Sequence, residues 1–176
     1  MTDLQAEKKL VLGYFNEIDS CNIDSLSEVI SKYASEDFSM KCTHPFNELG
    51  SIDLVANNLW KPIKDSFSPI QRRLDIFYAG INSLDKNKGK WISSMGHFMG
   101  VFNKPFVGLK PNYKSTLLRF AEFYKVENNK ITEGAIFLDL MNLMQQLGLS
   151  IIPESTGLIC VTPGPMNHKG LKFDIS

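Results

Sequence analysis

The sequence predicts a single α+β domain in which a strongly curved, mainly antiparallel sheet folds around helices packed on its inner face. The predicted elements follow the order helix, helix, strand, helix and then four strands. The four strand segments, about 70–82, 90–102, 114–126 and 130–138, are rich in β-branched and aromatic residues. Short links join at least the first pair and the last pair as antiparallel hairpins. Such a sheet forms a cone, and a cone open at one end forms a pocket.

Two helices are expected at the start of the chain. Thr2 or Asp3 can cap a first helix, in which apolar residues recur at near-helical spacing over 4–18. A second helix is predicted over about 25–33, with its apolar residues on one side.

A short strand over 38–43 comes next and ends in the loop HPFNELGS. This loop delivers Ser51 as the N-cap of a third helix, which reaches about Phe67. Pro62 is expected to kink or shorten that helix, because proline removes a backbone donor.

A closing helix over about 139–147 follows the last strand. The tail over 149–176 is rich in proline and glycine but still apolar, so we expect it to pack on the domain rather than remain disordered. The whole chain, 1–176, is therefore predicted to be one domain with its core over about 4–148.

Composition excludes several classes of function. Lys plus Arg equals Asp plus Glu at 19 each, so no net field attracts nucleic acid or an anionic membrane. The N-terminus lacks the apolar segment of a signal peptide, and no run approaches the roughly 18 apolar residues of a membrane helix. We therefore expect a cytoplasmic protein without nucleic-acid or membrane partners.

No pattern of a metal or cofactor site is present in the sequence. Three cysteines lie far apart without a CxxC pair, which indicates neither a disulfide framework nor a zinc site: Cys21, Cys42 and Cys160. The three histidines do not have ligand spacing: His44, His97 and His168. Nucleophile-elbow, phosphate-loop and dinucleotide-glycine motifs are also missing, so neither a metal nor a cofactor is expected.

Glu122 and His97 are the candidate catalytic residues, because each lies inside an apolar strand where an unpartnered polar group is costly to bury. Strand alternation places Glu122 with Phe120, Tyr124 and Val126 on one face. Glu122 is either a pocket acid or base, or a structural partner of Arg119, Arg73 or a backbone amide. His97 is either its acid/base partner across adjacent strands, or a core histidine hydrogen-bonded to a neighbour.

The other face of this strand, with Arg119, Ala121, Phe123 and Lys125, is predicted to be the outer or dimer-facing side. By the same alternation, His97 lines up with Met95 and Met99, and Asp75 lines up with Arg73, Phe77 and Ala79.

Further candidates for ligand contact each have a structural alternative. Asp139 is suited to cap the last helix at Asn142, and His44 and Asn47 are suited to brace their loop. Trp60 and Tyr124 are either core aromatics or rings that line the cavity, and Met95 and Met99 are either core filling or a pliable cavity wall.

Several segments resemble one known family. They are the N-terminal helix pair, the HPFNEL loop, WISSMGHFMGVF with the following PFVGLKP, LLRFAEFYKVENNKI and the ending LDLMNLMQQLG, which together cover most of 4–148. In these the chain is similar to the SnoaL-like polyketide cyclase family of the nuclear transport factor two-like superfamily, which has a cystatin-like fold. The resemblance implies a conical α+β barrel, a homodimer formed through the sheet, a largely apolar cavity and no cofactor.

The cyclases of this family close a polyketide ring by an intramolecular aldol condensation. Matching the hairpins at Lys130 and Ile131 places their pocket histidine at Glu122 and their catalytic aspartate at Ile136. Ile136 can contribute to a substrate-binding wall but cannot move a proton, so the family mechanism does not carry over in that form.

Three functions therefore stay open. The first is a cofactor-independent cyclase-type protein that binds a small aromatic or carbonyl-containing molecule, with acid/base cyclisation or isomerisation by Glu122 and His97. The second is a non-catalytic ligand-binding or dimerisation module. The third is an epoxide or lactone hydrolase built on Asp75, Asp139 and Arg119.

Geometry separates these functions. An enzyme should hold Glu122 and His97 within about 5 Å in a cavity of roughly 300 Å³ or more. A structural carboxylate should instead be locked to an arginine.

Overall fold

The computed structural model describes residues 4–84 and 88–149. Its helical elements are α1 (Gln5–Ser20), the short 3-10 turn η1 (Ile23–Ser25), α2 (Leu26–Tyr33), α3 (Ile52–Val55), η2 (Ala56–Trp60), α4 (Lys61–Ser66) and α5 (Leu140–Gln146). Its strands are β1 (Ala34–Cys42), β2 (Glu48–Leu49), β3 (Gln71–Ile81), β4 (Lys90–Val101), β5 (Ser115–Glu127) and β6 (Lys130–Leu138).

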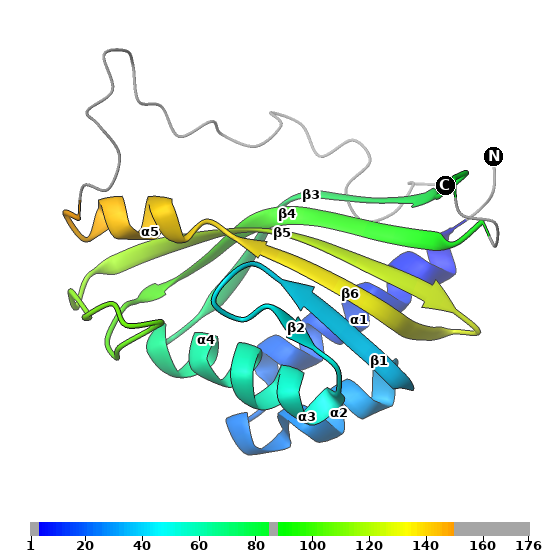
Figure 1. Cartoon of the computed structure of the whole chain (residues 1–176), viewed down its shortest axis with the longest axis horizontal. Coiled ribbons are helices and arrows are strands. Elements are labelled where there is room, and N and C mark those ends of the chain that lie inside the picture. The colour runs from blue at the N-terminus through cyan, green and yellow to red at the C-terminus, as the bar shows by residue number, and fades with distance from the viewer. Residues whose placement is uncertain (1–3, 85–87, 150–176) are drawn as a thin grey trace, which may run out of the picture.

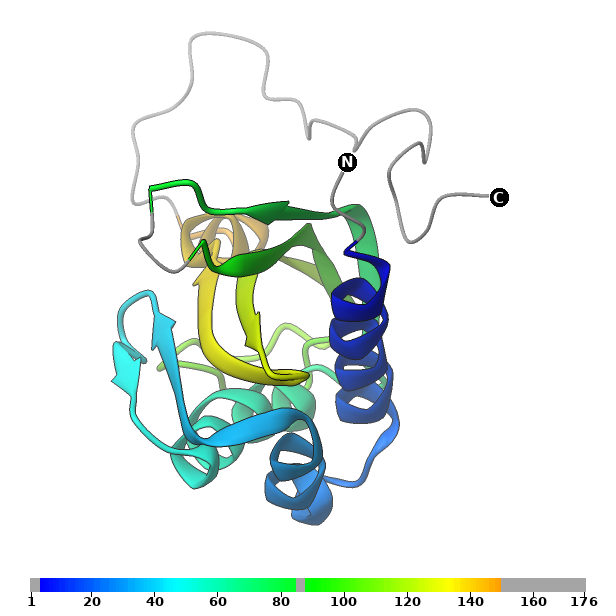
Figure 2. The same ribbon diagram turned by 90° about the vertical axis from the view of Figure 1, so that its right-hand side faces the viewer.

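The six strands form one curved sheet in the order β2-β1-β6-β5-β4-β3. Strands β1 and β6 are parallel, and every other neighbouring pair is antiparallel. Helices α1 to α4 cover one face of the sheet, whereas α5 continues from the end of β6 (Figures 1 and 2). The sheet stays open, with β2 and β3 as its edges. The predicted α+β class, with a curved and mainly antiparallel sheet around N-terminal helices, is confirmed.

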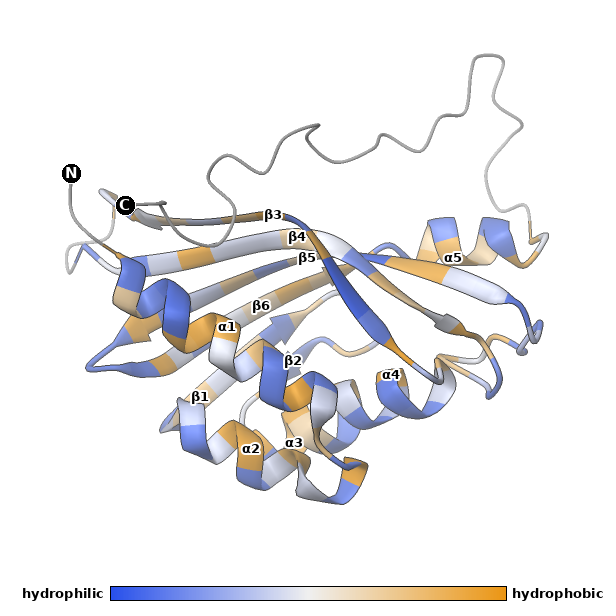
Figure 3. Ribbon diagram, turned by 180° about the vertical axis from the view of Figure 1, so that it is seen from behind, coloured by the Kyte–Doolittle hydropathy of each residue, from blue (hydrophilic) through white to orange (hydrophobic). Residues whose placement is uncertain are grey.

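Helix α1 forms because its apolar residues recur on one side. Val11, Tyr14, Phe15 and Ile18 follow the i, i+3, i+4, i+7 pattern and are all buried against the sheet. The alternating bands of hydrophilic and hydrophobic residues along the helices are visible in Figure 3. The predicted caps Thr2 and Asp3 lie outside the described residues.

The third predicted helix is interrupted in its middle. Ser51 caps it as expected, since its Oγ accepts the backbone N–H of Leu54 at 3.3 Å. The backbone is π-helical over η2, immediately before Pro62 in the first turn of α4. An irregular turn next to a proline is a usual form of helix distortion, so the kink predicted at Pro62 begins a few residues earlier.

Strand β1 begins at Ala34, four residues before the predicted start at Phe38. Its first residues read ASED, which have low strand propensity. Ala34 nevertheless pairs with Ile131 of β6, and the register shifts before Ser39. Pairing with β6 therefore decides the strand boundary here.

Strand β5 shows the predicted alternation. Its inner-face residues are buried beneath the helices: Leu118, Phe120, Glu122, Tyr124 and Val126. The other set lies on the outer face and is only partly buried. The inner face, together with α1 and η2, forms the hydrophobic core.

Two further expectations concern the tail of the chain and membrane-spanning helices. The predicted packing of the tail falls on residues 150–176, which lie outside the described residues. None of the helices described over 4–84 and 88–149 is both long and apolar enough to cross a membrane.

Candidate functional site

A buried ion pair lies at the centre of the inner face. Arg72 of β3 donates from Nη1 to Oε2 of Glu122 on β5 at 2.7 Å. The side chain of Arg72 is 3% exposed and that of Glu122 is 0% exposed. A charge buried to this degree is tolerated only with a partner, so each group holds the other in place.

Aromatic rings surround the guanidinium of Arg72. Its carbon lies 4.2 Å from the ring centroid of Phe15, 4.7 Å from that of Phe98 and 5.2 Å from that of Trp60. The faces of such rings attract a cation. The aromatic core of the cone therefore stabilises a positive charge as well as excluding water.

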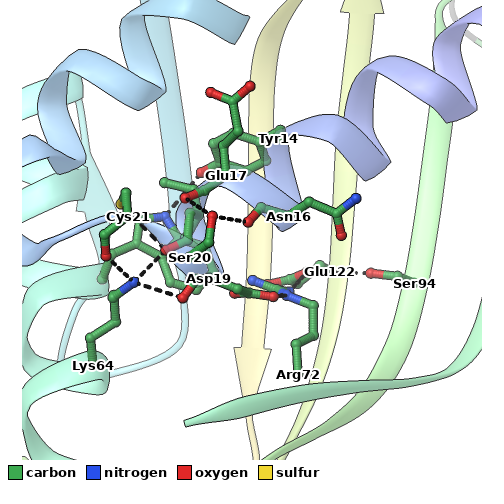
Figure 4. A network of polar contacts seen from close by, with 12 residues as sticks. Tyr14, Asn16, Glu17, Asp19, Ser20, Cys21, Lys64, Arg72, Ser94 and Glu122 are labelled. Atoms are coloured by element: carbon green, nitrogen blue, oxygen red, sulfur yellow. Dashed lines mark hydrogen bonds and ion pairs between the residues drawn. The ribbon is translucent and has the colours of Figure 1, made fainter. Parts of the chain in front are cut away.

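Two further side chains complete the polar network (Figure 4). Asp19, near the C-terminal end of α1, accepts from Arg72 Nε at 2.9 Å, and its side chain is 30% exposed. Ser94 of β4 donates its hydroxyl to Glu122 Oε2 at 3.3 Å. Arg72 thus connects a buried carboxylate to one that reaches the surface.

The end of α1 that carries Asp19 is itself held in place. Lys64 of α4 donates to the backbone carbonyl oxygens of Ile18, Asp19 and Cys21, at 2.5, 3.1 and 2.8 Å. A cation that binds the last carbonyls stabilises a helix C-terminus. Figure 4 shows Lys64 against this end of the helix.

Three buried polar atoms of the centre have no hydrogen-bond partner among residues 4–84 and 88–149: Glu122 Oε1, Arg72 Nη2 and the hydroxyl oxygen of Tyr124. A fork-to-fork pairing of guanidinium and carboxylate would use both oxygens and two nitrogens. Here Arg72 and Glu122 make a single contact, between Nη1 and Oε2, so Glu122 Oε1 and Arg72 Nη2 take no part in the pairing. Buried polar atoms without a partner are rare and need an explanation such as a bound molecule.

Burial and the partner's charge have opposite effects on the pKa of each member of the pair. Burial raises the pKa of Glu122 above its usual value, and the charge and hydrogen bond of Arg72 work against that rise. Burial disfavours a charged guanidinium, but Glu122 and Asp19 outweigh this effect, so the pKa of Arg72 is raised. Burial and the nearby Glu122 raise the pKa of Tyr124. The site therefore combines a fixed cation, a phenol that keeps its proton and a carboxyl group shifted towards neutral pH.

His97 does not join Glu122. In the β4–β5 register Ser94, not His97, lies opposite Glu122, and His97 lies opposite Arg119 on the outer face. His97 instead bonds through Nδ1 to Oδ2 of Asp75 at 2.9 Å. The predicted acid/base couple is therefore not formed, because the side chains of His97 and Glu122 lie on opposite faces of the sheet.

Three of the other predicted residues lie close to the Arg72–Glu122 pair. Tyr124 and Ile136 are fully buried, and Ile136 lies directly opposite Glu122 in the β5–β6 ladder. Trp60 packs on Arg72 and donates its indole N–H to the hydroxyl of Tyr14 at 2.9 Å.

The remaining predicted residues lie elsewhere. His44 and Asn47 are exposed in the β1–β2 loop, where Asn47 Nδ2 donates to the carbonyl of Pro45 at 3.2 Å. Asp139 caps α5, because its Oδ1 accepts the backbone N–H of Asn142 at 2.9 Å. Asn47 and Asp139 therefore have the loop-bracing and helix-capping contacts that were the structural alternatives for them.

Met95 and Met99 share the parity of His97 and point to the outer side. Met99 lines a cavity of about 250 Å³ between the start of β3, the end of β4 and Ser115. The residues lining this cavity do not include Glu122 or Arg72.

Arg72, Asp19 and Ser94 were not singled out from the sequence. Arg73 and Arg119 were the arginines considered as partners of Glu122, and both prove to lie on the outer face. Within residues 4–84 and 88–149, no group of three His, Cys, Asp or Glu side chains is arranged to hold a metal ion.

Comparison with known proteins supports the assignment from sequence. The model of the SnoaL-like polyketide cyclase family matches residues 86–147, which include β4, β5, β6 and α5. The resemblance to this family is confirmed. Curated proteins give no match to the sequence.

Solved structures of the same fold cover most of the chain. A candidate SnoaL-like polyketide cyclase from Jannaschia sp. CCS1 is 16% identical, with a TM-score of 0.64 over 86% of this chain and 95% of that one. AclR, a candidate hydroxylase from Streptomyces galilaeus, is 18% identical, with a TM-score of 0.64 over 86% and 85%. IdmH, a candidate polyketide cyclase from Streptomyces antibioticus, is 13% identical, with a TM-score of 0.61 over 80% and 96%. At these identities, the three neighbours establish the fold alone.

Proposed function

We propose that this SnoaL-like protein binds a small aromatic or carbonyl-containing molecule at the Arg72–Glu122 centre and transfers a proton there without a cofactor. The observation that carries this proposal is the set of three unpartnered polar atoms around a fully buried carboxylate. A purely structural pair would satisfy its own donors and acceptors, because an incomplete buried network is costly.

Each of the three atoms has a role in such chemistry. Glu122 Oε1 is free to take a proton from a carbon next to a carbonyl group. Arg72 Nη2 and the Tyr124 hydroxyl are free to donate hydrogen bonds to the oxygen on which negative charge develops. The roles first expected of His97 thus pass to Arg72 and Tyr124, which share the inner face with Glu122. The reaction class is aldol cyclisation or isomerisation.

A hydrolase of an epoxide or lactone is the second candidate, and one specific observation favours it. Asp19, Arg72 and Glu122 form a continuous carboxylate–guanidinium–carboxylate chain. Such a chain can orient a water molecule for attack and supply a proton to the leaving oxygen. The residues first considered for this network do not form it, since Asp75 binds His97 and Asp139 caps α5.

The third possibility is a non-catalytic ligand-binding or dimerisation module. Two features favour it, since Glu122 is bound to an arginine and the cavity of about 250 Å³ is not lined by Glu122 or Arg72. The decisive experiment must therefore measure binding and proton transfer separately.

We would incubate the protein in D₂O with a panel of small aromatic ketones, β-dicarbonyl compounds, epoxides and lactones. Binding is followed by thermal shift, deuterium exchange at the acidic carbon by NMR, and hydrolysis by product analysis. Glu122→Gln is the test variant, and Glu48→Gln, at an exposed position on β2, is the matched control.

Binding by all three proteins, with exchange lost only in Glu122→Gln, supports the acid/base enzyme. Binding with ring opening that depends on Glu122 supports the hydrolase. Binding without any reaction identifies the non-catalytic module, and the absence of binding by every compound refutes a ligand site at this centre.

We further propose a homodimer formed through the outer face of the sheet. Phe137 of β6 and Tyr78 of β3 are 54% and 52% exposed on that face. Exposed aromatic residues on a sheet are typical of interfaces. Light scattering should give the mass of a dimer, and Phe137→Glu should lower that mass to a monomer. A monomeric wild-type protein would refute this proposal.

A further inference from the structure

A row of basic side chains crosses the outer face of the sheet. Arg73 of β3 lies directly opposite His97 of β4, which lies directly opposite Arg119 of β5. Directly opposed residues have Cβ atoms about 5 Å apart and point to the same face. The chain contains only three arginines, so this row holds all of them except Arg72.

The two outer arginines have no partner in the described part of the chain. Neither Arg73 nor Arg119 forms an ion pair or a side-chain hydrogen bond there. Asp139 follows β6 beside Arg119, but its carboxylate is used to cap α5. Glu133, also from β6, binds Lys125.

His97 is the best-positioned group of the row. Its Nδ1 is bonded to Asp75, which fixes the ring, and the side chain is 15% exposed. The bond to Asp75 leaves Nε2 without a protein partner among the described residues. An imidazole oriented by a carboxylate in this way presents its second nitrogen to a ligand or a proton.

The charges of the row do not balance. His97 faces Asp75 and Arg73 from β3 and Arg119 from β5, and Asp139 follows β6 beside Arg119. Like charges on neighbouring positions of a sheet are destabilising, and the carboxylate of Asp75 is bonded to His97 while that of Asp139 caps α5, so neither carboxylate pairs with Arg73 or Arg119. An anion above His97 would remove this repulsion.

We propose that Arg73, His97 and Arg119 form an anion site on the outer face that takes a phosphate-type oxyanion. Two guanidinium groups in neighbouring positions are suited to such a group, because each can donate two parallel N–H bonds to its oxygens. Strands lie about 4.8 Å apart, so the arginines flank His97 at a spacing that their long side chains can span. The site is independent of Arg72 and Glu122, which lie on the opposite face.

Calorimetric titration with inorganic phosphate at constant ionic strength, at pH 6 and pH 8, tests the proposal. Phenyl phosphate and acetate are titrated in parallel to distinguish an organic phosphate and a simple carboxylate. We expect saturable binding of phosphate at both pH values, because the two arginines stay charged at each of them. Arg73→Gln and Arg119→Gln should each weaken binding by about ten-fold or more.

His97→Gln removes the oriented ring between the two arginines and should also weaken binding. Lys110→Gln is the matched control at an exposed position away from the row, and it should bind as the wild type does. Tighter binding of phenyl phosphate than of phosphate would identify the ligand as an organic phosphate.

The proposal is overturned if phosphate gives no saturable heat at either pH. Equal weakening in Lys110→Gln would overturn it as well, since binding would then be non-specific. A third result against it is a fall in molecular mass for the arginine variants without phosphate binding, which would mean that the row contacts a second copy of the chain. Each result is independent of proton transfer at Glu122.

Discussion

Replacing Arg72 with methionine tests whether Glu122 depends on its buried counter-charge. Methionine is unbranched and apolar, so it can keep the contacts with Phe15 and Phe98 while removing the charge. The ion pair is 2.7 Å long, with 3% and 0% of the two side chains exposed. Unit charges about 4 Å apart interact by about 4 kcal/mol at an effective dielectric constant of about 20.

The expected loss of unfolding free energy at pH 8 is therefore about 3–5 kcal/mol, which is the usual cost of removing one partner of a buried pair. For a chain of 176 residues, this corresponds to a fall in Tm of roughly 10 °C or more.

The loss should depend on pH. Burial raises the pKa of Glu122 from 4.5, and Arg72 opposes that rise, so the variant should have a higher value still. Between 4.5 and the raised pKa, the folded state holds a proton that the unfolded state has lost, so stability falls as the pH rises through this window. The variant should consequently be closer to the wild type at pH 5.5 than at pH 8.

Urea unfolding at both pH values would be measured for the wild type, Arg72→Met, Glu122→Gln and the double variant. The double variant should recover much of the stability at pH 8, because neither charge is then left alone. Additive losses, or a loss that is the same at both pH values, would show that Glu122 does not depend on Arg72 and would refute the reasoning.

Two further substitutions test the inner face by thermal unfolding. Gly96→Ala should cost about 3 kcal/mol, because a Cβ there would lie 2.0 Å from the carbonyl oxygen of Arg73. Gly80→Ala, where a Cβ meets nothing within 4 Å, is its control and should be nearly neutral; equal effects would contradict the strand packing. Ile136→Asp places a second carboxyl group beside Glu122. It should lower the free energy of unfolding by about 3–5 kcal/mol at pH 8, and by less at pH 5.5. An unchanged Tm would contradict this expectation.

The inner face of β5 could be predicted from the sequence, but its partner on β3 could not. On β5, strict alternation holds over its buried stretch, so Glu122 and Tyr124 were placed correctly. On β3, the register shifts between Leu74 and Ile76, with Asp75 as the additional residue. A bulge inverts the parity of everything beyond it.

This bulge accounts for the missed residue. Arg72 and Phe77 both lie opposite inner-face residues of β4, although simple alternation places them on different faces. The same bulge brings Asp75 to Nδ1 of His97. Asp75 is of a residue type with low strand propensity, but a single such residue does not specify a bulge, so only the pairing of the strands reveals it.

Asp19 was missed for a different reason. Its sequence position, at the end of α1, is typical of a solvated residue, and its partner lies 53 residues away. A long-range contact of this kind depends on how α1 packs across β3. The caps Ser51 and Asp139, by contrast, depend on the next three residues alone and are confirmed.

Ile136 limits what any proton chemistry at this centre can be. Since Ile136 cannot exchange a proton, Glu122 is the carboxylate that lies on the described inner face beside the unpartnered atoms of Arg72 and Tyr124. Burial raises the pKa of Glu122 while Arg72 opposes that rise, and a base with a raised pKa is better suited to abstract a proton from carbon. If Glu122 is the base, the rate should rise with pH through that raised pKa and then become constant. A structural Glu122 predicts no such dependence, so the pH profile distinguishes the two functions even where both bind the same ligand.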